Sequence, residues 1–243
     1  MGLMSITELG LQREVPLRSL VPDLRSLAEQ HGWLFRRQIH EPTSAASVSK
    51  YRGERLHFTW KETTETKEID QPFMDLCDLE LEQAPIRFLE IDLRGYFFGE
   101  SWWWSTVERK RAQARAFGES FLSFLKDAIR ISSPTHGLGD TDDQFTQEQL
   151  NTTILPPGEE LIPFIQRNPR RPWLAYFGPK LVQEHGAERI WRLGLSESHD
   201  VSGGVLAVFR KHPLFDADMS PEELREFRKR AETILRTNQR QQR

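Results

Sequence analysis

Apolar and polar side chains alternate in short segments of the first hundred residues. Leu56, Phe58 and Trp60 alternate with polar residues, and the same period of two recurs in residues 77–82, with Cys77 on the apolar side. Successive side chains of a strand point to opposite faces, so each segment predicts a half-buried β-strand. Further strands are expected at residues 33–39, 86–94, 173–177 and 205–209.

Two longer segments carry apolar residues at helical spacing. Leu20, Leu24 and Leu27 form one stripe. A second helix is expected to run from the capping box at 105–108 to about residue 130, and its expected buried stripe is Phe117, Phe121, Phe124, Leu125 and Ala128. Helices interrupt the strands irregularly, without a steady βαβ alternation. The sequence therefore predicts an α+β fold with a largely antiparallel sheet and helices packed on one face.

The chain is expected to form one domain over its 243 residues. Residues 132–158 are rich in Pro, Gly, Ser, Thr and Asp and lack an apolar period. This segment is predicted to be a long loop, or the hinge if the domain divides into two lobes.

Composition narrows the classes of function. A formal net charge of −3 argues against a general binder of nucleic acid or membrane surfaces. A single cysteine excludes an intrachain disulfide and a zinc site built from several cysteines. We expect no cofactor and no bound metal. The first residues do not resemble a signal peptide and no apolar run reaches spanning length, so a cytoplasmic location is expected.

No established catalytic motif occurs in the sequence. Asp140, Asp142 and Asp143, with His136, could supply ligands to a hard cation, but a solvated acidic loop is the favoured interpretation. Cys77 is expected to be a buried, inert thiol. An enzyme would have to assemble its site from distant residues such as His57, His136 and His199.

Residues 197–202 contain Glu197, His199, Asp200 and Ser202, which are residue types of a catalytic triad. Triad members normally converge from separate elements of a fold, so neighbours in sequence seldom form one. The following glycines favour a plain turn before the strand at 205–209.

Three consecutive tryptophans, Trp102, Trp103 and Trp104, cannot share one face of a strand or a helix. Together with Arg109 they predict a protein-binding surface, because Trp and Arg are typical hot-spot residues. One alternative is that two of the tryptophans join the core and the basic residues form a solvated helix face. A stacking platform for single-stranded nucleic acid is the other, less favoured alternative. The second possible contact surface, and the favoured one, is the acidic segment with Glu62, Glu65 and Glu68, which would suit a basic partner.

Four segments of the C-terminal third form a recognisable pattern: Pro172–Phe177, Gly204–Phe209, Pro213–Asp216 and a closing helix expected from Pro221. In these segments the chain resembles bacterial polymorphic-toxin immunity proteins. The chain departs from that pattern in the turn that follows Phe177. The resemblance implies a non-catalytic inhibitor that neutralises a cognate toxin by direct binding. Its expected partner is a basic toxin domain, and the chain is expected to be a monomer or weak dimer.

Overall fold

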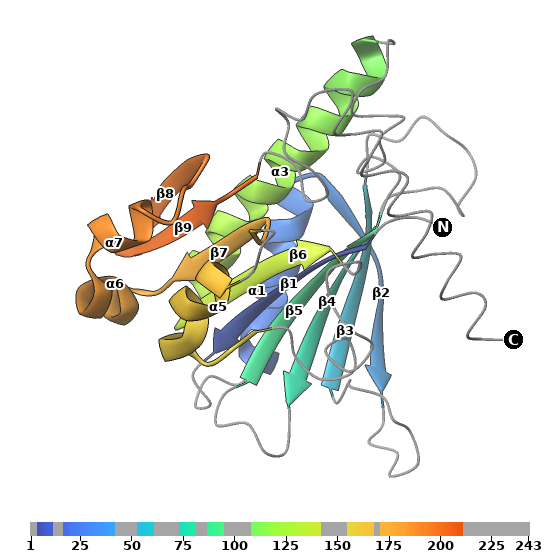
Figure 1. The fold of residues 1–243 in the computed structure, drawn as a ribbon. Helices are drawn as coiled ribbons and strands as arrows, with labels where there is room; N and C mark the ends of the chain where they lie inside the picture. The colour runs from blue at the N-terminus through green and yellow to red at the C-terminus, as the bar shows by residue number, and fades with distance from the viewer. Residues whose placement is uncertain are drawn as a thin grey trace, which may run out of the picture.

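One antiparallel sheet organises the molecule (Figure 1). The computed structural model describes residues 4–11, 17–41, 53–60, 73–80, 87–94, 108–141, 155–167 and 171–210. Within these ranges nine strands pair in the order β2-β3-β4-β5-β1-β6-β7-β9-β8. The strands are β1 (Met4–Leu11), β2 (Trp33–Glu41), β3 (Gly53–Trp60), β4 (Phe73–Glu80), β5 (Arg87–Arg94), β6 (His136–Thr141), β7 (Leu174–Phe177), β8 (Glu197–Val201) and β9 (Gly204–Val208).

Helices α1 (Leu17–Gln30) and α3 (Glu108–Ser132) cover one face of this sheet, and the predicted α+β class is confirmed. The predicted stripe of α3 is fully buried and consists of Phe117, Phe121, Phe124, Leu125 and Ala128. His31, just after α1, lies 2.9 Å from a carboxylate oxygen of Asp127 and joins the two helices. Among the described helices, none combines the length and apolar character that a membrane crossing requires.

A second, smaller core lies on the opposite face at the β7–β9 end of the sheet. Leu174 and Tyr176 of β7 point into the main core, whereas Ala175 and Phe177 point into the second one. This core is closed by η4 (Gly158–Glu160) and by short helices α5 (Leu161–Arg167), α6 (Pro179–His185) and α7 (Ala187–Trp191). Helices therefore lie on both faces of the sheet, with α1 and α3 on one face and the three short helices α5, α6 and α7 on the other.

Strand β6 lies inside the segment 132–158, where the sequence predicts a loop. A Cβ at Gly137 would lie 2.6 Å from Leu9 Cδ2, and one at Gly139 would lie 2.6 Å from Thr7 Oγ1. Side chains of the neighbouring strands fill the space above β6, which explains why this strand lacks an apolar pattern. The division into two lobes stays a prediction.

The faces of β4 also differ from the expectation. Met74 and Leu76 point into the main core, so Cys77 lies on the opposite face beside Asp75. The thiol is buried, as predicted, but its surroundings are polar rather than leucine-rich.

Two glycine substitutions test this packing. A Cβ at Gly204 would lie 2.5 Å from the Phe177 backbone oxygen, whereas a Cβ at Gly118 in α3 meets nothing within 4 Å. Gly204→Ala should lower the free energy of unfolding by about 1–3 kcal/mol through overpacking. Gly118→Ala should raise it by about 0.5–1 kcal/mol by favouring the helix. Urea unfolding measures both values, and equal stabilities of the two variants would contradict the described packing.

Candidate functional site

Charged side chains line the central strands on the sheet face that points away from α1 and α3. They alternate along each strand with residues of the main core. The four carboxylates among them are each at most 2% exposed. Acidic side chains are almost never buried this fully unless they are paired or hold a ligand, so this face is the candidate functional site. Its residues are Glu8, Arg55, His57, Asp75, Cys77, Glu90 and Asp92.

The strand register brings these side chains together. Cys77 lies directly opposite Glu90, and Asp75 lies directly opposite Asp92. Glu90 also pairs with Glu8 on its other side. Directly opposed residues have Cβ atoms about 4.5–5.5 Å apart. The potential ligand atoms of Cys77, Glu90 and Asp92 accordingly all lie within 4.8 Å of one another.

Asp75 is held by two partners from β3. Arg55 Nη2 donates to one carboxylate oxygen at 2.5 Å, and His57 Nδ1 lies 2.6 Å from the other. Asp75 is 2% exposed, so these bonds form largely away from water. Hydrogen bonds to a charged group are roughly twice as strong as neutral ones, so these two contacts hold Asp75 in place as a wall of the site.

The other side of the charged face is also satisfied by specific contacts. Glu8 accepts a hydrogen bond of 3.0 Å from the backbone N–H of Leu155. Asp140 on β6 forms a buried ion pair with Arg210, which follows β9. Asp140 is therefore a structural group on a strand and not part of a solvated loop, which corrects the expectation. Asp142 and Asp143 lie outside the described residues.

Burial strongly affects the Cys77 thiol. Removal from water raises the pKa of Cys77 well above its ordinary value, and the charges of Asp92 and Glu90 raise it further. Arg55 acts in the opposite direction. A thiol in this setting stays protonated at neutral pH and is a poor nucleophile, in agreement with the expected inertness.

His136 is held as a structural group. Its Nε2 atom lies 3.0 Å from the Pro156 carbonyl oxygen, and Nδ1 lies 2.8 Å from the Thr135 hydroxyl. The Pro156 carbonyl can only accept, so Nε2 carries a proton and donates to it. Burial lowers the pKa of His136, although the Pro156 hydrogen bond and the charge of Glu159 partly oppose this shift.

The triad-like segment forms the β8–β9 hairpin. His199 Nε2 lies 3.0 Å from a carboxylate oxygen of Glu197 on the same strand. Ser202 and Gly203 both have positive φ, at 54° and 75°, and form the two-residue turn. The interpretation of this segment as a turn before a buried strand is confirmed.

The other predicted binding residues are only partly described. Arg109 lies exposed in the first turn of α3. Glu62, Glu65 and Glu68 lie outside the described residues, as do Trp102, Trp103 and Trp104.

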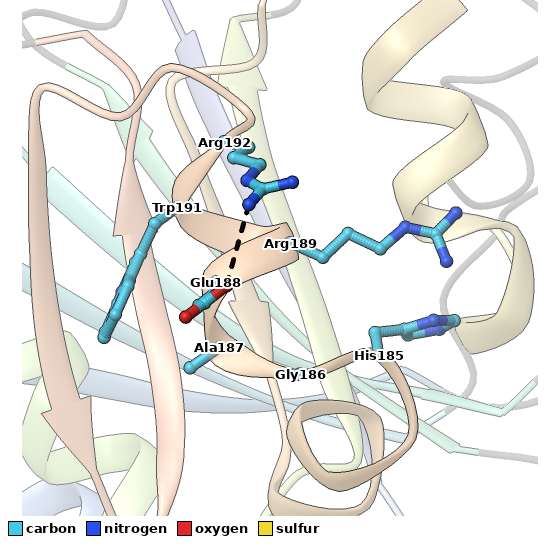
Figure 2. A pocket seen from close by; sticks show the side chains of 7 residues that line it. All are labelled: His185, Gly186, Ala187, Glu188, Arg189, Trp191 and Arg192. Carbon is cyan, nitrogen blue, oxygen red and sulfur yellow. Dashed lines mark ion pairs between the residues drawn. The ribbon is translucent and has the colours of Figure 1, made fainter.

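An exposed aromatic surface that sequence reasoning missed lies on α7. Trp191 is 55% exposed, and Figure 2 shows its ring on one side of α7 with Arg189 on the other. Gly186, with φ of 77°, connects α6 directly to α7. Arg192 lies 3.7 Å from Glu188 in an exposed ion pair. We call Trp191, Arg189 and Arg192 the α7 surface.

Comparison with known proteins finds little similarity. Neither a protein-family model nor a curated protein matches this chain. Among solved structures, the chain is similar to the Pseudomonas aeruginosa T6SS protein PA0821, with a TM-score of 0.40 and 14% identity. That alignment covers 90% of this chain and 69% of the other. PA0821 is thus a distant structural neighbour.

The buried His136 ring predicts a pH-dependent stability. Its pKa in the folded chain is lower than its ordinary value of 6.5, so the unfolded chain binds a proton first as the pH falls. The contribution is complete above about pH 6.5 and is lost as the pH falls through the lowered pKa. His136→Gln should therefore flatten the fall in unfolding free energy between about pH 7 and about pH 5. An NMR titration that placed the His136 pKa at or above 6.5 would contradict this account.

Proposed function

We propose that the chain is a non-catalytic binding protein of the immunity type, which neutralises a bacterial toxin by direct contact in the cytoplasm. The resemblance of the C-terminal third supports this proposal. Two of the resembling segments contain β7 and β9, the strands that carry the second core. That core in turn supports the helices on which the α7 surface lies.

The observation that carries the proposal is the exposure of Trp191. Trp33, Trp60 and Trp173 are at most 5% exposed, whereas Trp191 is 55% exposed. A large aromatic ring left in water on a rigid element is typical of a binding hot spot, because a partner gains its full burial. The other described tryptophans are thus buried in the core, whereas Trp191 is accessible to a partner.

The support beneath the α7 surface is fixed. Ile190 is 0% exposed and Leu193 is 2% exposed, and both belong to the second core. The backbone N–H of Arg192 donates to the Glu188 carbonyl at 3.0 Å. A surface held in this way loses little conformational freedom on binding, which favours affinity.

The charged side chains at the edge of the α7 surface can exchange their ion pair for one with a partner. The pair between Arg192 and Glu188 has side chains that are 82% and 81% exposed. Exposed pairs of this kind contribute little to stability, so either charge can exchange its partner at small cost. Arginine at the rim offers planar, bidentate hydrogen bonds to a carboxylate.

The acidic segment with Glu62, Glu65 and Glu68 and the run Trp102–Trp104 with Arg109 remain proposed contacts. The acidic residues would attract a basic toxin domain and accelerate association. The histidines offered for catalysis have other partners: His57 contacts Asp75, and His136 contacts Pro156 and Thr135.

The function is tested through genes adjacent to this one. Each neighbouring product is produced in a bacterial host with and without this chain, and growth and complex formation are measured. Rescue of a toxic product, with a complex that persists through gel filtration, is the expected outcome. A toxic neighbour that this chain neither rescues nor binds would contradict the proposal.

The α7 surface is tested in the purified complex. Trp191→Ala should weaken binding by about 30-fold or more, since hot-spot residues contribute at least about 2 kcal/mol. Leu34→Ala is the matched control, because Leu34 is also exposed, at 42%, but lies on β2 at the far end of the sheet. Biolayer interferometry measures both affinities. Equal affinities of the two variants would exclude Trp191 as a contact.

The acidic segment is tested by association kinetics. Reversing the charges of Glu62, Glu65 and Glu68 to lysine should slow association and reduce its dependence on salt, while dissociation changes little. An unchanged association rate in this triple variant would exclude the segment as a contact surface.

A further inference from the structure

We propose that Cys77, Glu90 and Asp92 form a binding site for one divalent transition-metal ion of the zinc type. The three side chains come from the adjacent strands β4 and β5 and are each at most 1% exposed. Their potential ligand atoms lie within 4.8 Å of one another. This site is independent of the α7 surface and of the proposed inhibitor function.

The backbone beneath the site is rigid. β5 pairs along its whole length with β4 on one side and with β1 on the other. Glu90 and Asp92 are two positions apart on β5, so both point to the same face, and Cys77 faces Glu90 across the ladder. Three ligands on two paired strands are therefore positioned before any ion binds, which reduces the entropic cost of binding.

The distances suit a small ion after modest side-chain movement. Zinc binds thiolate sulfur at about 2.3 Å and carboxylate oxygen at about 2.0–2.2 Å. Ligand atoms around a tetrahedral ion are then about 3.3–3.8 Å apart. The observed separations, within 4.8 Å, need side-chain rotations rather than a shift of the strands.

The donor set selects the class of ion. Thiolate is a soft ligand that magnesium and calcium do not favour, whereas zinc accepts sulfur and carboxylate oxygen together. Three protein ligands leave a fourth position of a tetrahedral site for water or another donor. Binding of the ion would displace the proton of the Cys77 thiol into solvent, and the divalent charge would then offset the repulsion between the resulting thiolate and the two carboxylates.

The surroundings of the Cys77 thiol also indicate a ligand. The thiol is 1% exposed and points at both carboxylates, and within the described part of the chain no hydrogen bond or ion pair engages its sulfur. Asp75, the next acidic group along β4, is instead bonded to Arg55 and His57. Asp75 therefore belongs to the wall of the site, where it fixes β3 against β4.

Cobalt titration tests the proposal directly, because Cys77 is the single cysteine of the chain. Addition of Co²⁺ to metal-free wild-type protein should produce a thiolate-to-cobalt charge-transfer band that saturates at one equivalent and disappears when Zn²⁺ is added. Histidines elsewhere can bind cobalt but cannot produce this band. Saturation without the band would overturn the proposal even if some metal were bound.

Variants identify the remaining ligands. Cys77→Ser should abolish the band, and Glu90→Gln or Asp92→Asn should weaken Zn²⁺ binding about tenfold or more in calorimetry. Asp200→Asn, on the exposed strand β8, is the matched control and should bind like the wild type. Circular dichroism verifies that each variant is folded before titration.

A measurement on the wild type alone covers the case in which the variants fail to fold. Binding to the native state raises its stability, so Zn²⁺ at about 100 times its dissociation constant should stabilise the chain and raise its melting temperature. Mg²⁺ at the same concentration should not. Wild-type protein whose melting temperature is unchanged by Zn²⁺, or folded Glu90→Gln protein with undiminished affinity, would overturn the proposal.

Discussion

The pairing of β1 between β5 and β6 is the constraint on which the rest of the structure depends. Leu9 pairs with Leu89 on one side and with Gly137 on the other, so the first described strand joins two parts of the chain that are distant in sequence. Without β1, the sheet β2–β5 and the strands β6–β9 would share no ladder. Contacts of such long range require loop closure before they stabilise anything, so we expect β1 to dock late and slowly in folding.

The placement of β1 also decides which residues can form a site. Its apolar side chains Leu9 and Leu11 complete the core beneath α1 and α3. Its other face brings Glu8 beside Glu90, at the centre of the charged face. A shift of one residue in this register would exchange the two faces and place a carboxylate in the apolar core. The register is therefore fixed by the apolar face, and the geometry of the charged face follows from it.

Much of the fold follows from local patterns, because those patterns have one consistent period. The stripe of α3 and the alternation of β3 could be predicted in this way, and the structure confirms both. β1 was missed because Thr7 and Glu8, two adjacent polar residues, occupy positions that are fully buried, which interrupts the apolar alternation. β6 was missed because its glycines give it no side chain on the main-core face.

The candidate sites could not be predicted for a different reason. Cys77 and Glu90 become neighbours only through the register of β4 and β5, which no local period contains. The same holds for Asp140 and Arg210, which meet only after β6, β7 and β9 have assembled. Trp191 was missed because its exposure depends on which residues of α7 the second core requires. Ile190 fills that requirement, and one step along a helix turns the side chain about 100° away.

The two halves of the sheet differ in the polarity of the face that points away from α1 and α3, and this difference has a physical cause. On β7 and β9 both faces are apolar, so short helices can pack on the second face and hold Trp191 in place. Over β3 to β5 that same second face is charged, and an apolar core could not continue across it without leaving carboxylates unsatisfied. The boundary falls at β1 and β6, where Glu8 bonds to Leu155 and Asp140 bonds to Arg210. These contacts satisfy the last charges before the second core begins, and they allow one continuous sheet to carry a buried polar site and a rigid exposed surface.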